Sequence, residues 1–364
     1  MATAESEAIE VRSGRRATSY DVARVAGVSQ STVSRALAAG APISAPLRKK
    51  VLSAARRLNY HPNAAARSLT TKRSRAVGFF LPNIGNPIYP FVLDAFGRQL
   101  RQHDRQVLLL PHVDSADEAL AWLMQFQLEG LVITAASPLG LSKAIALKCV
   151  KIGIPIVLFN RYFSDVRASS VNCENERGGA VAAETLVSGG HRRFAFIGGS
   201  EPTSSHTDRR AGFVARLREL GAPPPSIETT AFSYEGGYSA GLKLLSRKMR
   251  PDAIFCVTDS VALGVLDAAR YGHRLGVPED VSIMGFDDVP MAAWQGNGLS
   301  TIRLPVEEMT KRAVELLKRA TDDAPRVAQI INIAGELVIR TSTRPPHSTR
   351  QVARTSPASC SSTT

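Results

Sequence analysis

The sequence has few cysteines and no long apolar run. Its four cysteines among 364 residues, Cys149, Cys173, Cys256 and Cys360, show neither metal-ligand spacing nor a disulfide framework, so we expect a reducing compartment and no bound metal. No apolar stretch approaches the roughly 20 residues that cross a bilayer. Residues 1–16 lack the apolar stretch of a signal peptide. We therefore expect a globular protein of the cytoplasm that does not bind membranes.

Catalytic and nucleotide-binding motifs are also missing. There is no GxGxxG after the first apolar run, no GxxxxGK followed by Ser or Thr, no GxSxG and no HExxH. The glycine pairs at 178–179, 198–199 and 236–237 are better interpreted as turn residues or as small contacts at helix starts. Asp287 and Asp288 are adjacent carboxylates, but neighbouring residues at a strand end point in different directions. We therefore expect neither an enzyme nor a cofactor.

Acidic residues are nearly absent from one part of the chain. Residues 12–75 hold 14 lysines and arginines and a single acid, Asp21, whereas residues 76–342 hold 28 basic and 28 acidic residues. The net charge of +13 therefore belongs to the first of these segments. A surface that is basic only for solubility would not be concentrated in this way, whereas a module that binds phosphate groups would be.

Within the basic segment, residues 19–39 form two short helical patterns with a break at residues 26–28. Thr18 or Ser19 can cap the first pattern and Ser29 the second, and Gly27 allows the positive φ of a tight turn. The residues expected to face inward are Val22, Ala23, Ala26, Val33, Ala36 and Leu37. Those expected to face outward near the start of the second helix are Gln30, Ser31, Ser34 and Arg35. Such side chains read base edges in a major groove, so the pattern predicts a helix-turn-helix. Taken alone, it also fits an ordinary helical hairpin with a polar surface.

A basic amphipathic segment at 48–60 is expected to close a three-helix unit. The residues expected to line its inner side are Leu47, Val51, Leu52, Ala55 and Leu58. After a break at 61–63, the segment NAAARSLT is too short to be a stable helix in isolation. We expect it to become helical only against a partner or in a groove.

From residue 76 the pattern changes to short apolar runs separated by helix-length stretches. The runs are 76–82, 106–111, 130–134, 154–159, 194–199, 253–257 and 281–286. Fully apolar strands between helices indicate parallel sheets covered on both faces, here arranged in two similar doubly wound lobes. Ligands of such sheets bind beyond the carboxyl ends of the strands. Several runs end in polar residues at those positions, at 160–161, 258–259 and 287–288.

Together these segments resemble the lac repressor and purine repressor family of bacterial transcription regulators. The match is carried by SYDVARVAGVSQSTVSRAL, LNYHPNAAARSL and AVGFFLPNIGNPIYP, then by IPIVLFNR, DRRAGF and GLSTIRLP, over about residues 17–344. The resemblance implies a multidomain protein: a small all-α helix-turn-helix headpiece and an α/β two-lobed core, similar to periplasmic binding proteins, with two doubly wound parallel sheets. The implied segments are a disordered tail at 1–16, the headpiece at 17–62, a hinge helix and linker at 63–75, the core at 76–344 and a disordered tail at 345–364.

Position by position, the resemblance implies a set of DNA contacts. Gln30 and Ser31 match the pair that reads bases in the family, and Arg35 matches the arginine of the recognition helix. The positions that match contacts largely to the DNA backbone are Thr18, Ser19, Tyr20, Ser29, Thr32, Ser34, Ser44 and Tyr60. The hinge-helix positions are Asn63, Ala66, Arg67 and Leu69. Leu69 matches the leucine that enters the minor groove at the operator centre, where it unstacks a base step and kinks the DNA.

The resemblance also implies an effector site in the crevice between the lobes. The matching positions are Ile88, Tyr89, Thr134, Asn160, Arg161, Arg209, Phe232, Thr258 and Asp287. Arg209 and Asp287 suit the hydroxyls of a polyhydroxylated ligand, and Tyr89 and Phe232 suit its apolar faces. An alternative is that Arg161 and Asp287 form an ion pair between the lobes without contacting a ligand.

Three positions complicate this interpretation. Asn160 stands where many members of the family carry Asp, and Thr258 stands where one carries Asn, so we expect a ligand that differs from the familiar sugars. Trp294 fits either the core or the rim of the crevice.

The function implied is that of a DNA-binding repressor controlled by a small effector, with a carbohydrate as the expected class. The partners implied are a double-stranded, palindromic DNA operator and a second copy of the chain. The C-terminal residues are polar and carry no leucine heptad, so we expect a homodimer rather than a tetramer. The alternatives are an exported solute-binding protein, which the basic headpiece argues against, and a sugar-modifying enzyme, for which no catalytic constellation is present.

Overall fold

The structure is a computed structural model that describes residues 17–37, 41–61, 74–81, 85–110, 112–134, 140–200, 203–321 and 327–346. The chain divides into two compact units, Met1–Ser74 and Arg75–Thr364. The hinge-helix predictions at Asn63, Ala66, Arg67 and Leu69 lie outside the described residues, as do both predicted terminal tails apart from residues 345–346.

The described residues of the first unit form three helices around a small core. They are α1 (Ser19–Ala26), α2 (Gln30–Leu37) and α3 (Ala45–Arg57). Thr18 caps α1 in a capping box with Asp21, and Gly27 ends the helix in the left-handed conformation, with φ 60°. The Ser29 hydroxyl accepts a hydrogen bond from the Thr32 amide at 3.2 Å at the start of α2. The predicted caps and turn are therefore confirmed.

The buried residues of this unit follow the predicted pattern except at Leu52 and at Leu47, which is only half-buried and lies outside the packed cluster. The fully buried apolar residues are Val22, Ala23, Ala26, Val33, Ala36, Val51, Ala54 and Ala55. Leu52, which was expected inside, is exposed on α3, and Ala54 packs into the core instead. The inward face of α3 is centred on Val51, Ala54, Ala55 and Leu58, and Leu52 lies about 100° around the helix from Val51, outside that face.

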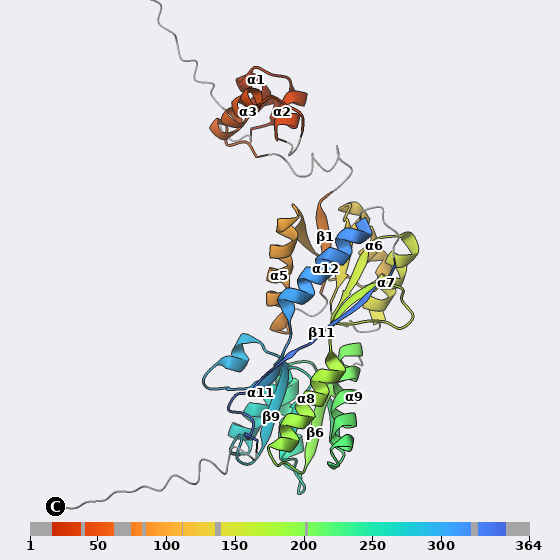
Figure 1. Cartoon of the computed structure of the whole chain (residues 1–364), viewed down its shortest axis with the longest axis vertical. Helices are drawn as coiled ribbons and strands as arrows, with labels where there is room; N and C mark the ends of the chain where they lie inside the picture. Colours follow the sequence, from red (N-terminus) through yellow and green to blue (C-terminus); the bar gives the residue numbers. More distant parts are fainter. Residues whose placement is uncertain are drawn as a thin grey trace, which may run out of the picture. The chain divides into compact units, whose positions relative to one another are not determined.

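The second unit contains two six-stranded sheets, one in each lobe (Figure 1). The strands of the first lobe are β1 (Ala76–Phe80), β2 (Gln106–Leu110), β3 (Gly130–Ile133), β4 (Ile156–Phe159), β5 (Ser169–Cys173) and β11 (Ile330–Ile333), in the order β11-β5-β4-β3-β1-β2. Those of the second lobe are β6 (Phe194–Gly199), β7 (Ser226–Thr230), β8 (Ala253–Cys256), β9 (Ser282–Asp287), β10 (Ser300–Arg303) and β12 (Glu336–Val338), in the order β12-β10-β9-β8-β6-β7. Within the described residues all pairings are parallel except that of β12 with β10. The predicted two-lobed architecture is therefore confirmed, with an antiparallel edge strand added.

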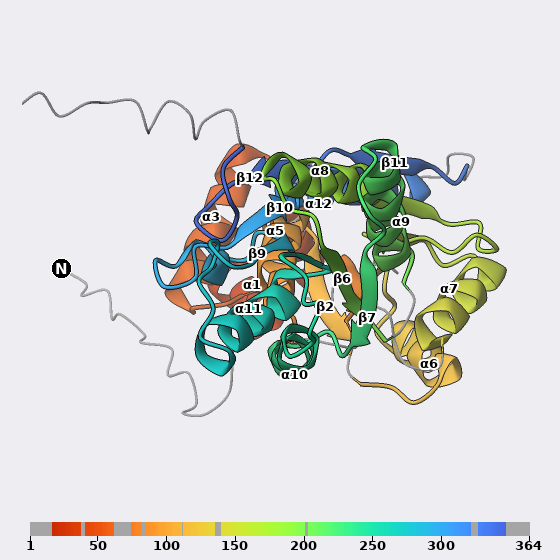
Figure 2. The same cartoon turned by 90° about the horizontal axis from the view of Figure 1, so that it is seen from below.

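Helices cover both faces of each sheet. In the first lobe they are α5 (Ile88–Gln102) and α12 (Val306–Thr321) on one face and α6 (Ala116–Gln125) and α7 (Leu141–Ile152) on the other. In the second lobe they are α8 (Asn175–Ser188) and α9 (Ser204–Glu219) on one face and α10 (Tyr234–Leu245) and α11 (Asp259–Asp267) on the other, as Figure 2 shows. The π-helix η2 (Ala268–Gly272) and the 3-10 helix η3 (Pro290–Ala293) follow. Phe79 packs toward α5 while Phe80 packs toward α6 and α7, which is why these strands are apolar throughout.

The chain passes between the lobes three times. It leaves the first lobe after β5 to enter α8, returns after β10 to form α12, and crosses again from β11 to β12. Residues 306–333 therefore supply the first lobe with a covering helix and an edge strand. The crossings join the lobes near the carboxyl ends of the central strands, where a ligand site was predicted.

The three cysteines that the structure describes are buried and free, as expected for small apolar filler. Burial raises the pKa of Cys149 and of Cys173 to about 12, which keeps both thiols protonated and unreactive at neutral pH. None of the described helices has the length and apolar character that crossing a membrane requires.

Candidate functional site

One candidate surface lies on the outward face of α2. Val33 and Ala36 are buried, so the helix turns Gln30, Ser34 and Arg35 toward solvent. Arg35 has no ion-pair partner within the described residues. The Gln30 side chain donates weakly to the Ser19 hydroxyl, at 3.4 Å, which joins the starts of α1 and α2. The arrangement leaves a set of exposed donors and acceptors beside one free guanidinium.

The remaining predicted positions of this unit surround that surface. Tyr20 is 73% exposed, which is unusual for an aromatic residue, and Ser44 is exposed at the start of α3 without a side-chain capping bond. Ser29 bonds the hydroxyls of Ser31 and Thr32, at 2.9 and 2.8 Å. Thr18 and Ser29 cap helices, so both have a structural role already, and half-buried Tyr60 packs against the core. DNA contact by these residues stays a prediction.

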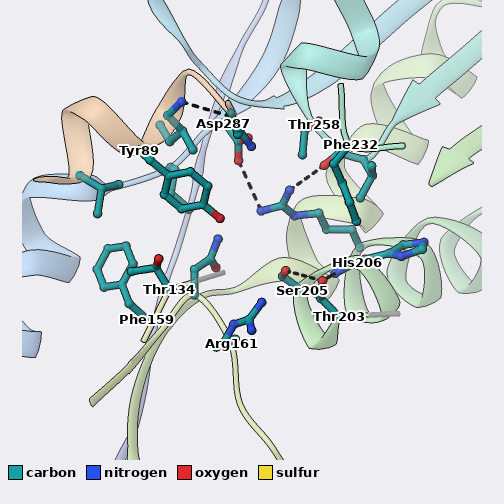
Figure 3. A pocket seen from close by; sticks show the side chains of 17 residues that line it. Tyr89, Thr134, Phe159, Arg161, Thr203, Ser205, His206, Phe232, Thr258 and Asp287 are labelled. Carbon is teal, nitrogen blue, oxygen red and sulfur yellow. Dashed lines mark hydrogen bonds and ion pairs between the residues drawn. The ribbon is translucent and has the colours of Figure 1, made fainter. Parts of the chain in front are cut away.

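A second candidate site is a pocket between the two lobes (Figure 3). Its cavity of about 90 Å³ suits a small molecule rather than a polymer. All nine predicted effector positions line it, from β1–α5, β3, β4, α9, β7–α10, β8 and β9. The residues that sequence reasoning missed are Asn86, Val92, Phe159, Thr203, Ser205, His206, Val257 and Leu304. Thr203 and Ser205 follow a strand end in the same way as the predicted residues, so their position after β6 could have indicated them.

Arg209 is held rigidly in this pocket. Its Nε donates to Asn175 Oδ1 at 2.9 Å, one terminal nitrogen donates to the Val257 carbonyl at 2.6 Å, and the other lies 3.5 Å from Asp287 Oδ1. The guanidinium also stacks on the Phe286 ring, 3.5 Å from its centroid. Its orientation is therefore fixed before any ligand arrives, as a binding site requires.

Asp287 is a buried carboxyl with an unusual backbone. Its φ of 121° is in a region that residues other than glycine rarely adopt, and such strain concentrates at ligand sites. Burial raises its pKa to about 6, although the nearby Arg209 opposes this shift. Its ion-pair partner is Arg209, from the same lobe, so the predicted alternative of an ion pair between Arg161 and Asp287 is wrong.

Arg161 differs from Arg209 in lacking partners. It is 5% exposed, its Nε has no hydrogen-bond partner in the described residues, and its guanidinium lies 5.8 Å from the Phe163 ring centroid. Burial lowers its pKa to about 10, so it remains charged at neutral pH. Beside it, Tyr162 joins the lobes: its backbone N–H donates to Ser204 Oγ and its hydroxyl to Asp208, both at 3.0 Å.

A second buried carboxyl, Asp259, lies behind the pocket. It accepts hydrogen bonds from the Thr301 hydroxyl at 2.6 Å and from the Val289 amide at 2.9 Å. Burial, together with the smaller effect of the negative charge of Asp287, raises its pKa to about 7. These bonds connect α11, β10 and the loop after β9, so Asp259 braces the segment that carries Asp287.

The raised pKa of Asp259 predicts a pH-dependent stability. The folded state binds this proton more tightly than the unfolded state, so its stabilising contribution is complete below about pH 4 and is lost as the pH rises through about 7. Asp259→Asn keeps a neutral side chain of the same shape, with an oxygen for the Val289 amide. We expect urea unfolding of the variant to show a smaller fall in stability between pH 4 and 7 than that of the wild type. Parallel curves for the two proteins would contradict this assignment.

Two other predictions were tested at strand ends. Asp287 and Asp288 do diverge: Asp288 pairs with Arg303 and Arg340, each at 2.7 Å, away from the pocket. Trp294 is 61% exposed and does not line the pocket, so neither of its two predicted locations is correct. It directly follows the short helix η3.

The glycine pairs make close contacts, as expected. A Cβ at Gly178 would overlap the Phe286 ring, and one at Gly179 would overlap the Arg209 carbonyl. The pair at 198–199 lies in β6 rather than at a helix start, which corrects its predicted place. Because a Cβ at Gly199 would occupy the space of the Phe232 ring, this glycine allows Phe232 to lie on the strand end beside the pocket.

Comparisons with known proteins cover both units. The sequence matches the family model described as bacterial regulatory proteins, lacI family, over residues 18–63, and that of a periplasmic binding protein-like domain over residues 183–343. It is 31% identical over 306 residues to the ribose operon repressor of Haemophilus influenzae, covering 83% of this chain and 91% of that protein. It is also 31% identical over 335 residues to the transcriptional regulator DegA of Bacillus subtilis, covering 91% and 99%.

Solved structures show the same similarity. The structure of the lac repressor dimer bound to operator and the anti-inducer ONPF matches with a TM-score of 0.80 at 25% identity, over 91% of this chain and all of that chain. A complex of the lac repressor with ONPG in the repressed state matches with a TM-score of 0.79, also at 25% identity, over 90% of this chain and all of that chain.

Proposed function

The chain belongs to the lacI family of bacterial regulatory proteins, and from this premise we propose that it represses transcription by binding a palindromic DNA operator as a homodimer. A small effector, of carbohydrate class, controls that binding from the pocket between the lobes. We infer a cytoplasmic protein without catalytic activity, with a headpiece at 17–62, a hinge at 63–75 and a core at 76–344. The lac repressor dimer on its operator supports the dimeric arrangement.

The observation that carries DNA binding is the outward face of α2. Its Gln30, Ser31, Ser34 and Arg35 combine base-reading chemistry with a helix of the right length to enter a major groove. The positive charge concentrated in residues 12–75 supplies the phosphate attraction that such binding needs. One recognition helix reads only a few base pairs, so a dimer on two half-sites supplies the specificity.

We expect Arg35→Ala to weaken specific operator binding by about 10- to 100-fold, the value of one good base contact of about 1–3 kcal/mol. The measurement is fluorescence anisotropy with operator and with random duplex at the same salt concentration. Arg24→Ala is the matched control, because it removes the same charge from α1, where the guanidinium bonds Asp21 at 2.8 Å. Equal losses of operator affinity in the two variants would show that Arg35 contributes only its positive charge and no base contact.

The hinge position Leu69 gives a second DNA-binding prediction. If its side chain enters the minor groove and kinks the operator, Leu69→Ala should weaken specific binding much more than nonspecific binding, because only the specific complex gains from the kink. Gel-shift titrations with both DNAs measure the difference. An equal loss on both DNAs is the contrary result.

Effector control follows from the position of the pocket. Ile88, Tyr89 and Arg161 come from the first lobe, and Arg209, Phe232 and Asp287 from the second. A ligand that binds both sets changes the relative free energy of open and closed lobes and therefore the spacing of the paired hinge segments. Both an inducer and a corepressor fit this scheme, and operator affinity measured with and without ligand decides between them.

The experiment that tests the whole proposal is genome-wide DNA selection with the purified protein, repeated with a pool of sugars. An enriched palindrome with a central CG-type step, beside genes of sugar transport or catabolism, supports a local repressor. Absence of any enriched palindrome both with and without sugars contradicts it. A solute-binding protein of a transporter, the alternative, would bind sugars in the pocket but enrich no DNA.

A further inference from the structure

The pocket contains one positive charge that the described residues do not neutralise. Arg161 is nearly fully buried, and among the residues that the structure describes it has no carboxylate partner and its Nε has no acceptor. The group that favours the charged form of Arg161 is the hydroxyl of Tyr89. Burial raises the pKa of this phenol, so Tyr89 stays neutral and does not supply a negative charge. A buried charge is ordinarily paired, so the missing partner points to a ligand.

Arg209, in the same pocket, is a buried arginine whose hydrogen-bond and ion-pair partners are present. It bonds Asn175 and the Val257 carbonyl, and it pairs with Asp287. Asp287 is the one carboxylate among the described residues that line the pocket. It already pairs with Arg209, at 3.5 Å, and is therefore not a partner for Arg161. The residue beside Arg161 in the chain is Asn160, whose neutral amide oxygen faces Asn175 at 3.2 Å. The described lining residues therefore include two guanidinium groups and one carboxylate.

A second source of positive potential lies beside Arg161. The bond from the Tyr162 backbone N–H to Ser204 Oγ brings this segment to the first turn of α9, a helix of 16 residues. Thr203 and Ser205 of that turn line the pocket, with their hydroxyl oxygens 3.1 Å apart (Figure 3). The first amides of a helix have no partner inside it and mark the positive end of its dipole, which favours an anion there.

We propose that the effector is an anionic sugar, whose charged oxygen group binds between Arg161 and the first turn of α9. Its hydroxyls face Arg209 and Asp287 at the other end of the pocket, and Tyr89 and Phe232 cover its apolar faces. The inference rests on the proposed function, because it needs the pocket to be the effector site. A carboxylate and a phosphate share the chemistry that Arg161 recognises, and the experiment separates them.

The test uses the full chain and pairs of sugars in which one member carries an anionic group at its terminal carbon and the other carries a hydroxyl there. Calorimetric titration compares glucose with glucuronate and glucose 6-phosphate, galactose with galacturonate, and ribose with ribose 5-phosphate, in the wild type and in Arg161→Met and Arg161→Lys. We expect an anionic sugar to bind on the order of 10- to 100-fold more tightly than its neutral counterpart, the gain typical of a charge-assisted hydrogen bond. Arg161→Met abolishes this preference, and Arg161→Lys retains part of it, because Lys keeps the charge but not the planar fork.

Two controls keep the proposal falsifiable. Arg210→Met removes an exposed arginine from α9 and is expected to leave the preference intact. Without ligand, Arg161→Met is expected to melt at a higher temperature than the wild type, since it removes an unpaired buried charge; a lower melting temperature contradicts the proposal. Neutral sugars that bind the wild type as tightly as their anionic counterparts reject the anionic effector and leave the proposed function intact. Absence of binding by every one of these sugars rejects the anionic effector, whereas failure of the DNA selection to enrich a palindrome rejects the proposed function.

Discussion

Gly212→Ala is expected to destabilise the core by about 3 kcal/mol or more, an effect at the upper end for overpacking. A Cβ at Gly212 of α9 would overlap the carbonyl oxygen of Glu176 in α8, and a Cβ at Gly179 of α8 would overlap the carbonyl of Arg209 in α9. The two helices therefore approach each other through reciprocal glycines. Because the obstacle on each side is backbone, a rotamer change cannot relieve the overlap.

The control for this prediction is Gly97→Ala in α5. A Cβ at Gly97 would meet no atom within 4 Å, so alanine should stabilise this helix by about 0.5–1 kcal/mol through its better propensity. Urea unfolding of the two variants compares the same chemical change in two environments. A fall in stability of less than 1 kcal/mol for Gly212→Ala would mean that the helices can separate at little cost.

Arg209→Met is the second change with a large expected effect. It removes the cation from a buried pair and leaves Asp287 and Asn175 without their guanidinium partner, at an expected cost of about 3 kcal/mol. The pKa of Asp287 is already raised, and without Arg209 it rises further. Because the protonated acid tolerates burial, the cost is smaller at pH 5 than at pH 8, which chemical denaturation at both values measures.

The double variant Arg209→Met with Asp287→Asn isolates the pair. With the carboxylate neutral, the missing cation matters less, so we expect the double variant at pH 8 to recover about 1–2 kcal/mol relative to Arg209→Met. Equal stability of the single and double variants would show that the bonds to Asn175 and Val257, rather than the ion pair, hold Arg209. Effector binding is expected to be lost in both.

The helical headpiece and the central strands could be predicted because both have strong local signals. Caps at Thr18 and Ser29 and the left-handed turn at Gly27 are short-range chemistry, and the central strands are apolar on both faces. The strands that sequence reasoning missed are β5 (SSVNC), β7 (SIETT), β10 (STIR), β11 (IINI) and β12 (ELV). Each is short and contains at least one polar residue. Their pairing is set by neighbours distant in sequence, so the local pattern does not reveal it.

The candidate pocket could be located from strand ends, but its electrostatics could not. The topology brings the nine predicted residues together, because parallel strands end at one edge of each sheet. Which acid neutralises which arginine depends on side-chain direction, so the pairing of Asp287 with Arg209 rather than with Arg161 had no sequence signal. The same holds for Trp294, since a large aromatic residue is most often at least partly buried.

The third crossing of the chain determines the order in which the two lobes can fold during synthesis. β11 pairs Ile330 with Ser170, 160 positions earlier, and α12 begins only at Val306. A ribosome that has delivered the first 300 residues has supplied most of the second lobe, while the first lobe still lacks a covering helix and an edge strand. The first lobe, which directly follows the DNA-binding segment in sequence, is thus completed by residues that emerge after most of the second lobe. Contacts between residues so distant in sequence carry a high entropic cost of loop closure, so we expect the folding of the core to be slow.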